Sequence, residues 1–225
     1  MDPVPDYEAF GAPSSSPSGK SFEEVVQSLQ AAMKNNPRDM QTLLSLGKTY
    51  YWYGQIARAV EVFQRAVELD GKEPAAYYHL GICHFRAARL EQASNALDKA
   101  VEIHPQFVMA HYWLGISSYH QGKYEKSLKC FETICYESPE SLIARYHAAL
   151  SCMALGRWER ARDHLETLAA SGSASTRVSL YLGRAYRRLN RPADAIKVLR
   201  RALALNPNDE MLAEALSDLT DVQEP

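Results

Sequence analysis

Apolar residues in this chain recur at intervals of three and four positions, with polar residues between them. In the stretch from 40 to 69 the large apolar groups include Leu43, Leu46, Tyr50 and Phe63. This spacing is typical of one face of an α-helix and differs from the alternation of a β-strand. The pattern breaks at turn signals such as Gly54 and at prolines, so it predicts short amphipathic helices joined by tight turns.

The pattern returns every 34 residues from Met40 onward, without insertion or deletion. Five windows result: 40–73, 74–107, 108–141, 142–175 and 176–209. Their eighth positions are Gly47, Gly81, Gly115, Ala149 and Gly183. Their twentieth positions are Ala59, Ala93, Ser127, Ala161 and Ala195. Small residues at both positions let two helices approach closely, so each window predicts one antiparallel helix pair.

A 34-residue period that carries Leu–Gly, Tyr, Gly, Ala, Phe or Leu, Ala and Pro in this order resembles the tetratricopeptide repeat. The resemblance covers residues 22 to 221. It departs from the family pattern at Gly71, which replaces a terminal proline, and at Ala148–Ala149, which replace Leu–Gly. The resemblance implies an all-α, right-handed superhelical solenoid of antiparallel helix pairs. It would hold five repeats, an N-terminal half-repeat and a C-terminal capping helix.

The two ends of the chain fit this architecture. Residues 22–35 have the apolar spacing of the second half of a repeat, and residues 210–222 are apolar on one face and acidic on the other, as a capping helix requires. Residues 1–20 are rich in Pro, Ser and Gly and are predicted to be disordered alone. The predicted organisation is a tail over 1–20 and one solenoid over 21–222, with twelve helices and no strand.

Composition excludes several classes of protein. The formal net charge of −2 gives no general attraction to nucleic acid, and no stretch approaches the ~20 apolar residues of a membrane span. The N-terminus has an acid where a signal peptide has Lys or Arg. The four cysteines form no CxxC pair and lie in apolar helical runs, which favours a reducing cytoplasm.

The resemblance implies that the first helix of each repeat lines a concave groove. Positions 2, 5, 9 and 12 of these helices fall on one face, which we call the first-helix stripe. The stripe is largely aromatic and aliphatic in the middle three windows and carries arginine in the fifth. With two adjoining residues, Trp113 and Arg188, the expected ligand-groove residues are Tyr51, Tyr78, Ile82, Phe85, Met109, Tyr112, Trp113, Ile116, Tyr119, Tyr146, Leu150, Arg177, Arg184, Arg187 and Arg188.

If the first-helix stripe were exposed, its apolar area would exceed that of the largest apolar patch on a typical monomer, roughly 300–600 Å². We therefore expect a protein or peptide segment with apolar or aromatic anchors to cover it. Three alternatives stay open: burial against adjacent helices, self-association into a homo-oligomer, and occupation by the chain's own tail.

The fifth window is strongly basic. Residues 176–201 hold eight cations and one acid, Asp194, whereas residues 209–225 hold six acids and no Lys or Arg. One interpretation is that these charges neutralise each other on a solvated surface. The other is that the arginines bind an acidic stretch or a C-terminal carboxylate of a ligand.

Catalysis finds no support in the sequence. Gly47-Lys48-Thr49 resembles the end of a phosphate-binding loop, but Thr42 stands where its first glycine belongs and no strand precedes it. His79, His120 and His147 would need to converge to hold a metal, and solvated or satisfied imidazoles are expected instead. We therefore expect a non-enzymatic protein without cofactor or metal.

The sequence thus predicts a cytoplasmic scaffold or adaptor that binds a protein segment. The alternatives are a self-assembling scaffold and a secretion-type chaperone for an amphipathic client. The tail combines Val4, Tyr7 and Phe10 with three acids, so residues 2–10 are a further candidate occupant of a groove, in their own chain or a neighbouring one.

Overall fold

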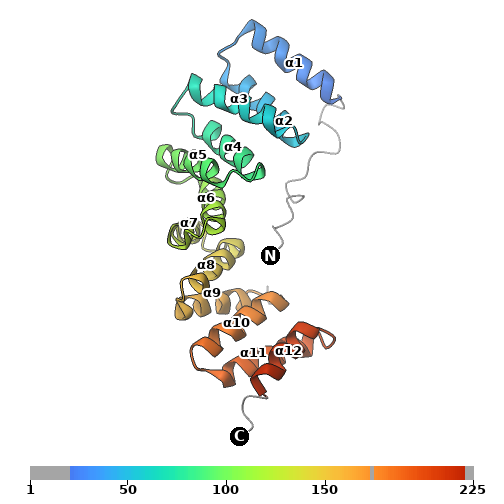
Figure 1. Cartoon of the computed structure of the whole chain (residues 1–225), viewed down its shortest axis with the longest axis vertical. Coiled ribbons are helices and arrows are strands. Elements are labelled where there is room, and N and C mark those ends of the chain that lie inside the picture. The colour runs from blue at the N-terminus through green and yellow to red at the C-terminus, as the bar shows by residue number, and fades with distance from the viewer. Residues whose placement is uncertain (1–20, 173–174, 221–225) are drawn as a thin grey trace. The chain divides into compact units, whose positions relative to one another are not determined.

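The computed structural model describes residues 21–172 and 175–220, and every regular element in them is an α-helix (Figure 1). In chain order the helices are α1 (Phe22–Asn35), α2 (Met40–Trp52), α3 (Ile56–Leu69), α4 (Pro74–Arg86), α5 (Leu90–Ile103), α6 (Val108–His120), α7 (Tyr124–Glu137), α8 (Leu142–Ala154), α9 (Trp158–Ala170), α10 (Thr176–Arg188), α11 (Pro192–Leu205) and α12 (Glu210–Thr220). Within this part of the chain the prediction of twelve helices is confirmed. The predictions for residues 1–20 lie outside the described residues.

The chain divides into two compact units between Trp113 and Leu114, inside α6. In the first unit α1 packs on α2, α2 on α3, α3 on α4 and α4 on α5. In the second unit α7 packs on α8, α8 on α9, α9 on α10 and α10 on α11, while α12 contacts both α11 and α10. Each unit is therefore a stack of helix pairs in chain order. The single solenoid over 21–222 stays a prediction.

Four first helices of the repeats, α2, α4, α8 and α10, begin at side-chain caps. The Asp39 carboxylate accepts a hydrogen bond from the Thr42 backbone N–H at 3.1 Å, and the Ser175 hydroxyl accepts one from Val178 at 3.3 Å. Glu73 and Ser141 cap α4 and α8 in the same way. Such caps satisfy backbone donors that have no partner inside the helix. The residue just before each of these four helices therefore fixes where the helix begins.

The turn inside each repeat requires a left-handed backbone at the fifteenth position. Gly54, Gly122 and Gly156 occupy it with φ of 72–74°, which costs glycine nothing. Ala88 and Asn190 occupy it in the second and fifth repeats, both with φ of 56°. A left-handed alanine costs about 1–2 kcal/mol, so the turn geometry is imposed by the helices on both sides.

The two helices of a repeat are in close contact at the eighth position of the window. A Cβ added to Gly47 would lie 2.6 Å from the Phe63 ring, and one added to Gly115 would lie 2.7 Å from the Phe131 ring. Gly81 meets the Leu97 side chain at 2.5 Å in the same way. Real Cβ atoms do not pack so closely, because protein interiors are already close-packed. The eighth position thus sets the spacing between the paired helices.

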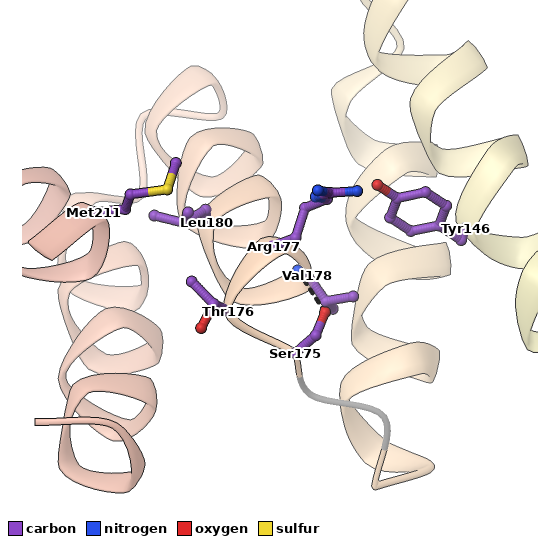
Figure 2. Close-up of a pocket in the computed structure, with 7 residues that line it drawn as sticks. All are labelled: Tyr146, Ser175, Thr176, Arg177, Val178, Leu180 and Met211. Carbon is purple, nitrogen blue, oxygen red and sulfur yellow. Dashed lines mark hydrogen bonds between the residues drawn. The ribbon is translucent and has the colours of Figure 1, made fainter. Parts of the chain in front are cut away.

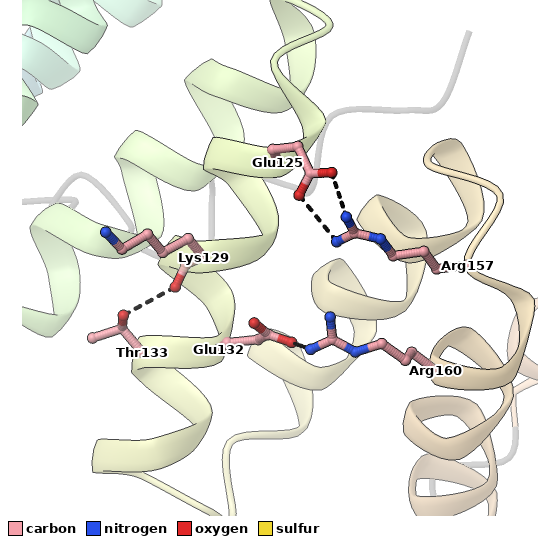
Figure 3. Close-up of polar contacts among 6 residues, drawn as sticks. All are labelled: Glu125, Lys129, Glu132, Thr133, Arg157 and Arg160. Carbon is pink, nitrogen blue, oxygen red and sulfur yellow. Dashed lines mark hydrogen bonds and ion pairs between the residues drawn. The ribbon is translucent and has the colours of Figure 1, made fainter.

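Ion pairs also join second helices of neighbouring repeats in the second unit (Figure 3). The Arg157 guanidinium donates to both carboxylate oxygens of Glu125, at 3.0 and 2.5 Å, and thus connects the start of α9 to α7. Arg160 pairs with Glu132 one turn further along. Exposed pairs contribute little individually, roughly 0–1 kcal/mol, but the bidentate geometry fixes the register of α9 against α7.

The close contact at the eighth position leads to a test. Gly115→Ala should reduce the free energy of unfolding by about 1–3 kcal/mol, because the new methyl group overlaps the Phe131 ring. The fourth repeat combines Ala149 with Leu165 at the corresponding positions, so Phe131→Leu should recover part of this loss in the double variant. Urea unfolding of the three variants measures both effects.

Gly71→Ala is the matched control, because its new Cβ would meet nothing nearer than 3.8 Å. Its unfolding free energy should change by no more than about 0.5 kcal/mol. Equal stability of Gly115→Ala and Gly71→Ala would contradict this account of the packing.

Candidate functional site

The stripe residues of the first unit pack against neighbouring aromatic side chains. Tyr78 and Tyr112 are half-buried, and the Tyr78 ring centroid lies 5.1 Å from that of Phe107. Phe85 lies 5.3 Å from the buried Trp113 ring, and Ile82 is buried. Burial raises the pKa of Tyr78 to about 12 and also raises the pKa of Tyr112. The first-helix stripe of this unit therefore keeps only part of its aromatic surface in contact with solvent.

The remaining stripe residues of the first unit are also partly covered. Tyr51 is half-buried, and the Arg86 guanidinium carbon lies 4.9 Å from its ring centroid. Burial is the main cause that raises the pKa of Tyr51, and the Arg86 charge opposes it. Met109 is half-buried on α6. A ligand on this unit would meet a cation over a ring rather than a bare apolar surface.

The stripe of the second unit is more open. Tyr119 packs against Tyr124 at 5.3 Å, and Ile116 is buried, whereas Tyr146 and Leu150 are half-buried. The predicted arginines Arg177, Arg184, Arg187 and Arg188 are all exposed. The polar and apolar parts of the predicted site thus meet on α8 and α10.

A cavity of about 600 Å³ lies at this meeting point, between the start of α10 and neighbouring helices (Figure 2). Its lining consists of Tyr146, Ser175, Thr176, Arg177, Val178, Leu180 and Met211. Figure 2 shows the Tyr146 phenol oxygen and the Arg177 guanidinium directed toward each other. The cavity therefore offers apolar side chains from α10 and α12 beside a cation and a phenol.

The carboxylate of Asp209 joins the starts of α10 and α12, the two helices that supply most of the cavity lining. It accepts a hydrogen bond from the Thr176 hydroxyl at 2.7 Å and another from the Leu212 backbone N–H at 3.2 Å. The first bond reaches the start of α10 and the second caps α12. Asp209 thus places Met211, whose side chain is 64% exposed, beside the first turn of α10.

Sequence reasoning missed part of this lining. The expected ligand-groove residues include none from the capping helix, yet Met211 occupies position 2 of a sixth window, the position of Arg177 and Ile143 in the windows before it. Ile143 and Met211 are two of the exposed large apolar side chains of the described residues. The signal that identifies Met211 is thus the 34-residue register continued past the fifth repeat.

The arginines beyond the cavity differ in their surroundings. The Arg188 guanidinium carbon lies 5.5 Å from the Trp158 ring centroid, and Arg191 pairs with Asp194 at 2.7 Å. Arg184 and Arg187 form no ion pair with any other residue that the structure describes. The acids Glu214 and Asp218 of the adjacent α12 are likewise exposed and unpaired within residues 175–220. Glu214 and Asp218 therefore do not neutralise these two arginines by direct contact.

Two of the three histidines of the predicted groove rim stack on core aromatic rings. His79 stacks on Phe63 with ring centroids 5.1 Å apart, and His147 stacks on Phe131 at 5.0 Å. Burial lowers the pKa of each imidazole to about 4. Among residues 21–172 and 175–220, no group of three or more His, Cys, Asp or Glu side chains is placed to hold a metal ion. These two rings thus act as packing groups of the repeat core.

The Gly47-Lys48-Thr49 tripeptide lies inside α2, with Gly47 against the Phe63 ring. A phosphate-binding loop needs exposed backbone N–H groups before a helix, and this glycine is within one. The tripeptide therefore belongs to the repeat packing.

Three family models match parts of the chain. Two models for the tetratricopeptide repeat match residues 53–114 and 146–210. A third model, described as anaphase-promoting complex, cyclosome, subunit 3, matches residues 98–168. These matches agree with the 34-residue period and the paired helices. The chain belongs to the tetratricopeptide-repeat family. This fold supports a general role as a protein–protein interaction scaffold.

Solved structures of tetratricopeptide-repeat proteins share its fold. The chain resembles YrrB, described as having an unusual peptide-binding site, with a TM-score of 0.78, 18% identity, and coverage of 86% of this chain and 99% of that one. It resembles MamA with a TM-score of 0.59, 25% identity and coverage of 77% and 91%. For MamA from Desulfovibrio magneticus RS-1 the TM-score is 0.68 and the identity is 16%, with coverage of 76% of this chain and 97% of that one. A comparison with curated proteins found no match.

No helix within the described ranges of this tetratricopeptide-repeat chain is long and apolar enough to cross a bilayer.

The stacked histidines predict a pH dependence of stability. Their pKa is about 4 in the folded state and ordinarily 6.5, so the unfolded chain binds more protons between these values. The free energy of unfolding should therefore be greatest above pH 6.5 and decrease as the pH falls toward 4. In His147→Phe this loss should shrink by roughly 1–3 kcal/mol, measured by urea unfolding at pH 7, 5.5 and 4.5. The same pH dependence in both proteins would show that His147 does not stay neutral when buried.

Proposed function

We propose that the chain is a non-enzymatic scaffold that binds a protein segment at the α10–α12 site. This name denotes the cavity lined by Tyr146, Arg177, Leu180 and Met211, continued along α10 by Arg184 and Arg187. The observation that carries the proposal is an open apolar cavity followed along α10 by Arg184 and Arg187, which form no ion pair with a described residue. Its volume of about 600 Å³ is in the range of ligand sites and suits one large apolar side chain with its neighbours.

The dimensions favour a chain segment over a compact small molecule. Arg177 and Arg187 lie ten residues apart on one helix, which corresponds to about 15 Å. An extended segment of about five residues spans that length. YrrB, described as having a peptide-binding site, shares this fold and supports the same kind of ligand.

The first unit offers a second surface for the same segment. Tyr51, Tyr78 and Tyr112 keep part of their rings exposed, although most of the stripe around them packs internally. We assign them a lesser share of the binding free energy, because rings that already pack against their neighbours have less apolar surface left to bury against a ligand.

The cellular setting is part of the proposal. Cys83, Cys130 and Cys152 are buried free thiols, and burial raises the pKa of Cys83 to about 12 and that of Cys152 to about 11. Such thiols are unreactive and need no oxidising compartment. We therefore propose a cytoplasmic scaffold.

The apolar cavity can be tested with peptides selected from a random library on the purified full chain. Met211→Glu should weaken binding of these peptides by at least tenfold, because it places a charge in the cavity. The melting temperature should hardly change, since Met211 is exposed. Fluorescence anisotropy of a labelled peptide measures the affinity.

Leu205→Glu provides the matched control. Leu205 is 69% exposed on α11 and does not line the cavity, so this variant should bind like the wild type. Equal affinities of the Met211→Glu and wild-type chains would contradict the proposed site.

A further inference from the structure

The charge and the apolar lining of the α10–α12 site restrict the ligands that can bind there. We infer that the site accepts residues 6–10 of a second copy of this chain, an inference that rests on the proposed function. Phe10 would enter the cavity, and the acids Glu8 and Asp6 would face Arg184 and Arg187.

Arg184 and Arg187 can accept new acidic partners. Both are exposed, and neither forms an ion pair with a described residue. Guanidinium groups bind carboxylates in a planar, bidentate geometry, which gives a defined position as well as attraction. An acidic segment would therefore be held at fixed points along α10.

The spacing along α10 specifies the segment. From Leu180, which lines the cavity, Arg184 lies about 6 Å and Arg187 about 10.5 Å along the helix axis. In an extended chain alternate residues point to one side, and they are about 6.6 Å apart. Acids two and four residues before an apolar anchor would thus lie about 6.6 and 13 Å from it, within reach of the two long side chains.

This pattern is rare in the sequence. Two acids separated by one residue occur only at Asp6/Glu8 and at Glu68/Asp70. The first pair is followed two residues later by Phe10, whereas the second is followed by Lys72. Residues 6–10 are therefore the one segment of the chain with acid, acid and a large aromatic residue on the same face of an extended strand.

The neighbouring helix sets the orientation. Glu214 and Asp218 on α12 are exposed, and α12 packs against α10. Their charges repel an acidic segment, so its carboxylates must face α10. Replacing both with lysine should therefore strengthen binding of residues 6–10.

A labelled peptide of residues 1–20, added to the full chain, tests the inference by fluorescence anisotropy. The Arg184→Glu/Arg187→Glu chain should bind the wild-type peptide at least tenfold more weakly. A peptide with Asp6→Lys and Glu8→Lys should bind the wild-type chain equally weakly but regain at least tenfold affinity for the charge-reversed chain. Arg200→Glu/Arg201→Glu is the matched control, because it reverses two exposed arginines on α11 and should change affinity less than threefold.

Sedimentation of the full chain adds an independent measurement. The average molar mass of the wild type should increase with protein concentration, because copies associate. The average molar mass of the Asp6→Lys/Glu8→Lys chain should increase less. Equal peptide affinities for the wild-type chain and the Arg184→Glu/Arg187→Glu chain would overturn the inference.

The inference and the proposed function can fail separately. If library-selected peptides bind in a Met211-dependent way while the 1–20 peptide does not bind, the inference is wrong and the proposed function stands. If neither binds, both are wrong.

Discussion

The contact between the eighth position of each first helix and the twenty-fourth position of its partner determines the rest of the structure. At Gly47, Gly81 and Gly115 the facing side chain leaves no room for a Cβ atom. This contact fixes the distance between paired helices and the rotation of the first helix about its axis. The same face of each first helix is therefore directed away from its partner, so positions 2, 5, 9 and 12 are left for neighbours or ligands. Tyr146, Arg177 and Met211 come together because they share this register.

Much of the fold follows from this register alone, since the 34-residue period gives the number, order and pairing of the helices. The exposure of the stripe residues does not follow from it. Ile82, Ile116 and Trp113 are buried while Tyr146 stays half-exposed, because burial depends on the size of side chains from other helices. The left-handed Ala88 was likewise not predictable, since its turn is held by the helices around it and not by local preference.

The charges of the fifth repeat show a second limit of sequence reasoning. Composition places basic and acidic residues next to each other in the chain, and this leaves both neutralisation and ligand binding open. Proximity in sequence does not create an ion pair, which needs N and O atoms within 4 Å. Arg191 meets this condition with Asp194, whereas Arg184 and Arg187 meet it with no described residue. The basic stripe of α10 thus keeps its charge beside an apolar cavity.

Ligand binding at the α10–α12 site is tested most directly by NMR of the methionine methyl groups. The full chain, labelled with ¹³C at the methionine methyls, would be titrated with a library-selected peptide. Met211 is 64% exposed in the cavity, whereas Met33 is 8% exposed in the core of the first unit and serves as the internal reference. The account predicts that the Met211 resonance shifts in proportion to peptide bound while the Met33 resonance stays in place. A saturating peptide that leaves Met211 unshifted would contradict it.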